Sequence, residues 1–268
     1  MQTTAPETPE SPRTLRKKYL LEGRLGEGGM ATVWRARHLL MGREVAIKIL
    51  HPEVAKLPNV TTRFLQEARA AWLVDHPNVV SVLDVDVDDD GAPFIVQEML
   101  DGEDLEAFLQ KRTRLQPAEV VGLVAPVLEA LVAAHGRGVV HRDLKPSNVF
   151  LARTARGVVP KLLDFGISRI ASDDARLTST GVVMGTPAYM APEQIQTPRD
   201  VTASADLWAF GVMCFELLTG ELPFEGATSG DLLVKVCTSR PRALRALTPT
   251  VPEALARAVM QCIQRDVS

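Results

Sequence analysis

The sequence is short of cysteine, of net charge and of long apolar runs, and each shortage argues against a class of protein. Its three cysteines, Cys214, Cys237 and Cys262, are widely spaced in apolar stretches. An odd number at this spacing fits neither a disulfide framework nor a cysteine metal site, and it predicts buried free thiols in a reducing compartment, the cytoplasm. A net charge of −3 gives no electrostatic basis for binding nucleic acid or an anionic membrane.

Apolar residues do not collect into membrane-spanning or export segments. No run approaches the ~20 apolar residues that cross a bilayer. Residues 1–18 open with proline and threonine and then turn basic, without the apolar core of a signal peptide. We therefore expect a soluble chain with no membrane contact by this segment and a disordered tail over residues 1–18. A membrane anchor in sequence beyond residue 268 stays open.

The remaining composition is ordinary for a folded protein, with 46% hydrophobic and 24% charged residues in a chain of 268. It excludes disorder and allows one large core or two small ones. The hydrophobic periodicity divides the chain near residues 98–103. Before this boundary it predicts one helix at 61–74 and strands at 19–25, 31–39, 43–50, 79–87 and 94–97. After the boundary it predicts helices at 104–112, 117–136, 204–219, 230–239 and 252–265, the second of them kinked but not broken at Pro126.

Two polar features are interpreted as structural. Five aspartates lie between Asp84 and Asp90, but the positions that a calcium loop reserves for glycine and glutamate hold Asp89 and Ile95. This run predicts a solvated hairpin turn that ends at Gly91. Four histidines have no ligand-like neighbours at metal spacing, which predicts structural or surface roles for His38, His51, His76 and His135.

Most of the functional information lies in residues 141–148, which read HRDLKPSN, and in residues 164–166, which read DFG. Transfer of a phosphoryl group needs a base, a cation that stabilises phosphate charge, and metal ligands. This stretch supplies them at the loop spacing that the reaction requires, through Asp143, Lys145, Asn148 and Asp164.

A glycine-rich turn near the N-terminus fits the same chemistry. Residues 25–33 read LGEGGMATV between two predicted strands. Glycine lets backbone N–H groups approach phosphate oxygens closely, although many strand-joining turns are also glycine-rich. The turn is followed by Lys48 on the third strand and Glu67 on the next helix. The turn, the lysine and the glutamate come in this order before residues 141–148, the catalytic loop. This order argues against interpreting them as three unrelated surface features.

Together these motifs resemble the eukaryotic-like serine/threonine protein kinases of bacteria. The resemblance runs from about residue 19 to residue 266 in unbroken motif order, and residues 185–193, GTPAYMAPE, resemble the bacterial branch in particular. It implies an α+β, bilobal fold with a small β-rich lobe over residues 19–97, which carries one main helix. A hinge over 98–103 and a larger, mainly helical lobe over 104–268 would follow. MgATP would bind between the lobes, with Mn²⁺ as an alternative metal.

The resemblance also implies which residues hold ATP. Gln97 would be the gatekeeper behind the adenine, Ala46 would pack over the ring, and Phe150 would lie beneath it, where a smaller aliphatic residue is more usual. Ala31 replaces the third glycine of the family's turn. The full set of expected contacts is Leu25, Gly26, Gly28, Gly29, Val33, Ala46, Lys48, Gln97, Glu98, Leu100 and Phe150.

By the same resemblance, Asp143 would orient the substrate hydroxyl and accept its proton, and Lys145 would steady the γ-phosphate. Asn148 and Asp164 would hold Mg²⁺, and Glu67 would pair with Lys48. His141 is interpreted as a packing partner of Phe165 rather than as a base. Asp206 would hold the backbone of the catalytic loop by hydrogen bonds.

Regulation and substrate class are also implied. Arg142 directly precedes the catalytic aspartate. This arrangement resembles kinases whose activation loop must be phosphorylated, because a buried guanidinium requires an anionic partner. Thr178 and Thr180 are favoured over Ser179 as that phosphosite. Thr186, with Pro146 after Lys145, is typical of kinases directed at serine and threonine. We expect a protein substrate, and self-association where one copy phosphorylates another.

Three alternatives are weighed. A pseudokinase would be expected to lack one of four residues that are all present, Lys48, Asp143, Asn148 and Asp164. A small-molecule phosphotransferase would not be expected to carry the long loop that ends in the Ala-Pro-Glu anchor at Glu193. The third is an incomplete kinase. The resemblance places the arginine partner of Glu193 and a final helix after residue 268, so we expect the second lobe to be incomplete at its C-terminus and less stable for it.

Overall fold

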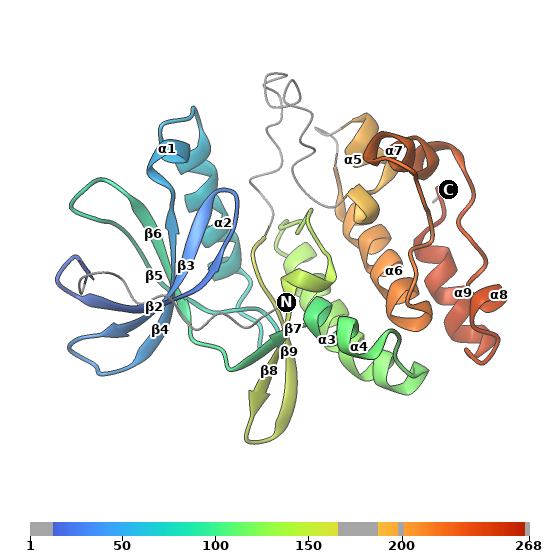
Figure 1. Ribbon diagram of the computed structural model, residues 1–268, viewed down its shortest axis with the longest axis horizontal. Helices are drawn as coiled ribbons and strands as arrows, with labels where there is room; N and C mark the ends of the chain where they lie inside the picture. Colours follow the sequence, from blue (N-terminus) through green and yellow to red (C-terminus); the bar gives the residue numbers. More distant parts are fainter. Residues whose placement is uncertain (1–12, 166–186, 198–200, 266–268) are drawn as a thin grey trace. The chain divides into compact units, whose positions relative to one another are not determined.

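The computed structural model describes residues 13–165, 187–197 and 201–265, which form two compact units. The first unit runs to Asp101 without residues 76–78, and the second combines residues 76–78 with the chain from Gly102. One unit is β-rich and the other mainly helical (Figure 1). The expected α+β class is therefore confirmed.

A six-stranded antiparallel sheet forms the first unit, in the order β1-β2-β3-β4-β6-β5. Its strands are β1 (Thr14–Leu15), β2 (Tyr19–Glu27), β3 (Ala31–His38), β4 (Glu44–Leu50), β5 (Val82–Val87) and β6 (Pro93–Glu98). Burial alternates along β4, where Val45, Ile47 and Ile49 are buried and Ala46 and Lys48 are only partly so. Successive side chains of a strand point to opposite faces, so Ala46 and Lys48 share one face of the sheet.

Two helices cover part of this sheet, α1 (Pro52–Ala55) and α2 (Val60–Leu73). α2 buries Val60, Phe64, Ala68 and Ala71, which recur at the spacing of one helix face. Phe64 and Ala68 belong to the same core cluster as Leu50 of β4 and Ile95 of β6. This packing sets the orientation of Glu67, which directly precedes Ala68 on α2.

The N-terminal tail predicted over residues 1–18 is too long. Residues 1–12 lie outside the described residues, but β1 pairs with β2, and Leu15 is fully buried. Arg13 and Arg16 form ion pairs with aspartates of the acidic turn between β5 and β6, and Lys18 pairs with Asp84 of β5. This turn does form the predicted hairpin, with Gly91 at a φ of 85°. Its aspartates are paired rather than merely solvated.

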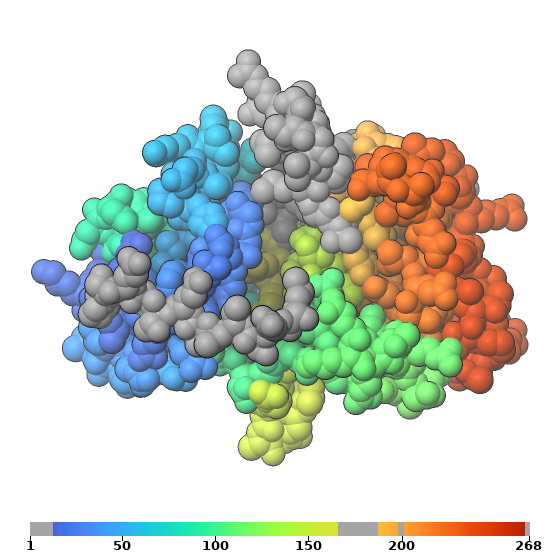
Figure 2. All heavy atoms as spheres, viewed as in Figure 1, coloured from blue at the N-terminus to red at the C-terminus, as the bar shows by residue number. Residues whose placement is uncertain are grey.

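The second unit has a three-stranded antiparallel sheet that the sequence patterns did not predict, in the order β7-β8-β9. Its strands are β7 (Gly102–Asp104), β8 (Val149–Thr154) and β9 (Gly157–Leu162). The tip of the β8–β9 hairpin is exposed and projects from the surface (Figure 2). β8 begins directly after the short 3₁₀ turn Pro146–Asn148, so this sheet supports the catalytic loop.

Helices make up most of the second unit. They are α3 (Leu105–Arg112), α4 (Pro117–His135), α5 (Pro192–Gln196), α6 (Ala203–Thr219), α7 (Ser229–Thr238), α8 (Leu244–Leu247) and α9 (Glu253–Cys262). α6 is buried along most of its length, whereas α4 buries one face, where Val120, Val124 and Val127 share helical spacing. α4 contacts both α6 and β9. Pro126 does not break it, as predicted.

α4 corrects one sequence expectation. Among the described residues it is the one helix that is long and apolar enough to cross a membrane by length and composition. The statement that no run approaches that length was therefore wrong. Its buried positions also include Ala130, Leu131 and Ala134, and the helix packs against α6 and β9 of the same unit.

Candidate functional site

The first unit holds the predicted lysine and glutamate pair in contact. Nζ of Lys48 donates a hydrogen bond of 2.7 Å to Oε1 of Glu67. Their side chains are only 15% and 9% exposed. Lys48 comes from β4 and Glu67 from the packed helix α2, so two independent elements set the position of one cation. A charge-assisted bond of this length restricts the position of the ammonium group, which would be mobile in a solvated lysine.

Sheet register brings three of the other predicted ATP contacts onto the face that carries Lys48. Val33 of β3 lies opposite Lys48, and Gln97 of β6 lies opposite Ala46. Partners in an antiparallel pair project from the same face, so these four side chains are grouped. Leu25 and Gly26 lie near the end of β2, and Gly26 pairs with Val33. Glu98 and Leu100 follow at the end of β6, partly buried.

The glycine-rich turn closes into a tight hairpin between β2 and β3. The backbone N–H of Gly28 donates to the carbonyl of Ala31 over 2.9 Å. A Cβ at Gly28 would meet only that carbonyl oxygen, at 3.6 Å, and a Cβ at Gly26 would meet nothing within 4 Å. Both glycines therefore leave open backbone, as a loop that lies against phosphate oxygens needs.

The second unit holds the catalytic loop. Nδ2 of Asn148 donates to the carbonyl oxygen of Asp143 over 2.7 Å and to its Oδ2 over 3.1 Å. Nζ of Lys145 lies 3.3 Å from the same Oδ2. The carboxylate of Asp143 is thus oriented by an amide and faced by a cation. Three of the four residues predicted to carry the chemistry meet at one atom.

Asn148 is also arranged as an oxygen ligand. Both of its amide hydrogens face Asp143, which leaves Oδ1 as an acceptor, and its carbonyl accepts the N–H of Leu163 over 2.9 Å. Asp164 follows Leu163 directly, at a φ of 28°. Amide and carboxylate oxygens are the ligands that Mg²⁺ prefers, so this pair fits the metal. No group of three histidine, cysteine or acidic side chains gathers among the described residues, so other oxygens would complete the shell.

His141 is placed as a packing residue, as predicted. It is fully buried, and its ring lies 5.1 Å from that of Phe165. Its Nδ1 accepts the N–H of Asp143 over 3.3 Å, and its Nε2 lies 3.0 Å from the carbonyl oxygen of Leu163. An acceptor at Nδ1 and a donor at Nε2 make a neutral ring, with both nitrogens already used. His141 therefore has no free nitrogen to serve as a base.

Asp206, near the start of α6, holds the backbone of the catalytic loop by hydrogen bonds. It is fully buried and accepts hydrogen bonds of 2.7 Å each from the backbone N–H of His141, the backbone N–H of Arg142 and Nε2 of His135. The first two bonds were predicted. The third was not, because His135 was assigned only a structural or surface role. The signal was a histidine at the end of a mainly apolar helix.

Arg142 is held with its guanidinium partly desolvated. Burial lowers its pKa from the ordinary arginine value, and attraction to Asp206 opposes that shift. Its Nε is buried without a hydrogen-bond partner among the described residues, and Nη2 reaches the carbonyl of Val201 only at 3.5 Å. The expected phosphate partners Thr178 and Thr180, like Thr186, lie outside the described residues.

Two side-chain hydrogen bonds near the Ala-Pro-Glu anchor were not predicted from the sequence motifs. Nε2 of Gln194 donates to the carbonyl of Arg142 over 2.8 Å, which ties the anchor to the catalytic loop. Oε1 of Glu193 accepts the hydroxyl of Ser204 over 2.9 Å. Glu193 thus has a partner within α6. A sequence motif records only chain order, so neither side-chain bond could be read from it.

A partly buried acid, Glu216, lies on α6. The hydroxyl of Tyr189 donates to Glu216 over 2.5 Å. Burial raises the pKa of Glu216, the Tyr189 bond opposes the shift, and the charge of Glu106 adds to it. Burial likewise raises the pKa of Tyr189 well above its usual value.

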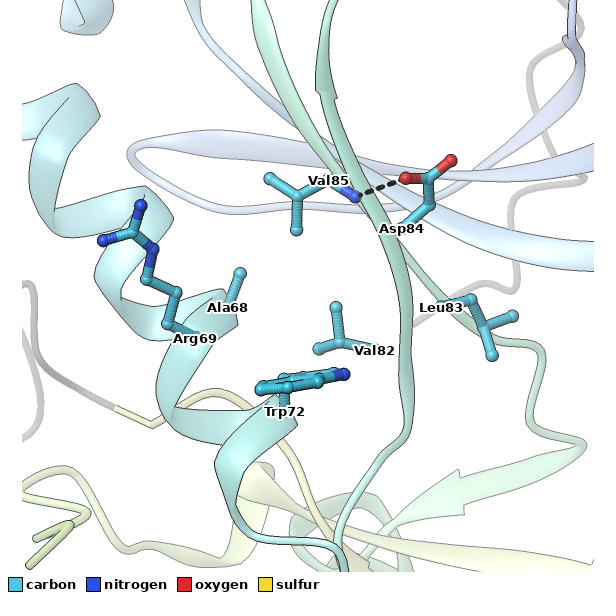
Figure 3. A pocket seen from close by; sticks show the side chains of 7 residues that line it. All are labelled: Ala68, Arg69, Trp72, Val82, Leu83, Asp84 and Val85. Atoms are coloured by element: carbon cyan, nitrogen blue, oxygen red, sulfur yellow. Dashed lines mark hydrogen bonds between the residues drawn. The ribbon is translucent and has the colours of Figure 1, made fainter.

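A hollow of about 260 Å³ opens elsewhere, between α2 and the edge strand β5. Ala68 and Trp72 project from α2 toward Val82 and Val85 of β5 (Figure 3). None of the predicted ATP or catalytic residues lines it. Asp84 turns its Oδ1 back onto the N–H of Val85 over 3.0 Å, so the hollow offers apolar walls and little polar chemistry.

Known proteins are similar to this chain over most of its length. Residues 19–267 match the family model of the protein kinase domain. The serine/threonine-protein kinase Pkn1 of Myxococcus xanthus is 41% identical over 92% of this chain and 35% of its own length. PkaA of Streptomyces coelicolor, a serine/threonine-protein kinase, is 38% identical over 95% of this chain and 48% of its own.

A more distant match is the serine/threonine-protein kinase PrkC of Bacillus subtilis, 32% identical over 93% of this chain and 38% of its own length. The chain therefore spans between about a third and a half of the curated relatives it matches.

Proposed function

Because the chain belongs to the protein kinase family, among the eukaryotic-like serine/threonine kinases of bacteria, we propose that it transfers the γ-phosphoryl group of ATP to serine or threonine hydroxyls of proteins. The family uses ATP with a divalent metal, typically Mg²⁺. Mn²⁺ would be an alternative metal, since it too prefers oxygen ligands. The observation that carries the proposal is the meeting of Lys145 and Asn148 at the carboxylate of Asp143.

Phosphoryl transfer needs alignment and charge neutralisation more than covalent chemistry. The carboxylate of Asp143, oriented by Asn148, is suited to accept a hydrogen bond from a substrate hydroxyl and then its proton. Lys145, beside that carboxylate, would face the charge on the transferring group. Bound Mg²⁺ would neutralise phosphate charge, and Asn148 and Asp164 would hold it.

Lys48 supplies the second cation of the mechanism. Its bond to Glu67 positions an ammonium group on the sheet face that also carries Val33 and Ala46. A fixed cation costs no reorganisation when it stabilises phosphate oxygens. In this proposal Leu25, Gly26, Gly28, Gly29, Gln97, Glu98, Leu100 and Phe150 complete the nucleotide site.

Regulation by phosphorylation of the activation loop is part of the proposal. It is supported by the partly desolvated guanidinium of Arg142 and its buried Nε, which lacks a partner among the described residues. A phosphate on Thr178 or Thr180 would supply the charge that this group attracts. Self-association would let one copy modify another.

The decisive test is transfer of labelled γ-phosphate from ATP. Matched peptides that differ only in a serine, threonine or tyrosine should be phosphorylated on the first two and not on the third. Mass spectrometry of the protein itself would locate its own phosphosites. A chain that binds MgATP but transfers no phosphate would refute the proposed activity. We further propose a cytoplasmic location, where ATP is present and the free thiols stay reduced.

A further inference from the structure

His51 is bonded through both its backbone and its side chain to the returning arm of the glycine-rich hairpin. Its N–H donates to the carbonyl of Met30 over 2.9 Å. Its Nε2 lies 2.9 Å from Oγ1 of Thr32, and either atom can be the donor, depending on the tautomer. The hairpin is thus attached at two points, one on each side of Ala31.

The position of His51 explains why one residue can make both bonds. It follows β4 directly, and its N–H extends the β3–β4 ladder one step beyond the pair of Ala31 and Leu50. Its carbonyl accepts the N–H of Ala55 over 2.9 Å and so begins α1. Its side chain makes no capping bond to that helix, so the ring is available to Thr32.

The attachment is continuous with the cation that grips phosphate. Lys48 lies on β4, three residues before His51, and is paired with Val33, the neighbour of Thr32. Met30 and Val54, which flank the attachment, pack on the core cluster that includes Phe64 of α2. α2 carries Glu67, the partner of Lys48. The hairpin, the lysine strand and the glutamate helix therefore meet around His51.

We infer that Thr32 and His51 are positioning residues that hold the glycine-rich hairpin ready for the phosphates of ATP, an inference that rests on the proposed function. A glycine-rich turn samples many backbone conformations, and ordering it on binding costs conformational entropy. An arm that is already attached at residues 30 and 32 loses less freedom when nucleotide arrives. The pair acts on nucleotide binding and leaves the proton transfer at Asp143 untouched.

The test separates nucleotide binding from turnover. Thr32→Val keeps the β-branched shape of the strand residue and removes the hydroxyl, and His51→Leu removes the ring nitrogen. Each should raise the KM for ATP and the Kd for MgATP by about two- to tenfold, the range of one net hydrogen bond. The kcat at saturating ATP and the KM for peptide should stay at wild-type values. The double variant should bind ATP no more weakly than the weaker single variant.

Conservative variants and a control guard against a merely structural effect. Thr32→Ser and His51→Gln keep hydrogen-bonding groups and should return the KM for ATP toward wild type. Thr154→Val removes a comparable bond, 2.7 Å from Oγ1 to the carbonyl of Gly157 in an exposed hairpin, and should leave all constants unchanged.

The outcomes are distinct. If Thr32→Val and Thr154→Val share the wild-type KM for ATP, or if Thr32→Ser weakens ATP as much as Thr32→Val, the inference is wrong. If the wild type binds MgATP but transfers no phosphate, the proposed activity fails, and the Kd values still decide the role of the pair. If the wild type binds no MgATP, both fail.

Discussion

Asp206 and Arg142, 64 residues apart in sequence, are joined by a hydrogen bond of 2.7 Å from the backbone N–H of Arg142 to Oδ1 of Asp206. Arg142 has a φ of 65°, a left-handed conformation that costs energy for a residue with a side chain. The buried carboxylate holds the strained turn in place, one residue before Asp143.

Asp206→Asn should therefore weaken both stability and activity. An amide keeps one acceptor but sets an NH₂ group against the N–H of His141 and the ring of His135. We expect a loss of about 1–3 kcal/mol in the free energy of unfolding for each group left unsatisfied, with a lower kcat. Chemical denaturation and ATP turnover would check this, with the exposed Asp75→Asn as control. Unchanged kcat in a folded variant would remove the organising role of Asp206.

Asp143→Asn should lower kcat by at least ~10²-fold, the lower range for losing a positioned general base. The substitution keeps the size of the side chain, and Lys145 and Asn148 remain in place, so MgATP affinity should change little. Initial rates and a nucleotide binding assay would measure the two effects separately. Near-normal turnover would show that another group accepts the proton.

Lys48→Met should reduce phosphate transfer on the order of 10²-fold, as when one preorganised electrostatic donor is removed. Glu67→Gln should act in the same direction, because it releases the ammonium group from its 2.7 Å bond. Rates would be measured at saturating MgATP. The matched controls are Lys111→Met and Glu103→Gln, which break a surface pair whose lysine side chain is 66% exposed. Equal rates for both pairs would place the phosphate cation elsewhere.

Thr178→Ala combined with Thr180→Ala should lower activity, and phosphatase treatment of the wild type should have the same effect. Arg142→Gln should make the enzyme insensitive to phosphatase, because the cation that would bind the phosphate is gone. Mass spectrometry would follow the phosphosites alongside the rates. Phosphate confined to other residues of a fully active enzyme would contradict this assignment.

Glu216 should make stability depend on pH. Its pKa in the folded chain lies above the ordinary 4.5, because burial disfavours the carboxylate. The folded state binds this proton more tightly than the unfolded state does. The resulting stabilisation of the folded state is fully present below pH 4.5 and is lost as the pH rises through the raised pKa of Glu216. Glu216→Gln keeps an acceptor for Tyr189 without the charge, so its Tm should exceed that of wild type by a margin that grows with pH above 4.5. Glu253→Gln, whose side chain is 77% exposed, serves as control; equal margins for both variants would refute this account.

The sequence predicted what depends on chain order and local pattern. Periodicity located the five main strands of the first unit and α2, and the roles assigned to His141 and Asp206 agree with the geometry. β1 was missed because two residues are too short for any period to show. In the β7–β9 sheet, β7 spans only three residues and β9 contains a proline, so neither shows a clear strand pattern.

Contacts between distant side chains could not be predicted in the same way. His135 and Asp206 are 71 residues apart, and Thr32 and His51 are 19 apart. Nothing in either local sequence marks the partner, because the meeting depends on how helices and strands pack. The same holds for Arg13 and Asp88, which are 75 residues apart.

The aspartates at the end of β5 and in its turn to β6 are neutralised by cations from the start of the described chain. Five carboxylates within seven residues repel one another, and the guanidinium of Arg13 bridges two of them at 2.9 Å each. Burial would raise the pKa of Asp84, but hydrogen bonds from Lys18 and Tyr19 outweigh it and lower that pKa. A chain shortened to begin at Tyr19 would lose Leu15 from the core and leave this repulsion uncompensated. Added salt should then stabilise the shortened chain by screening like charges, while it weakens the ion pairs of the intact one.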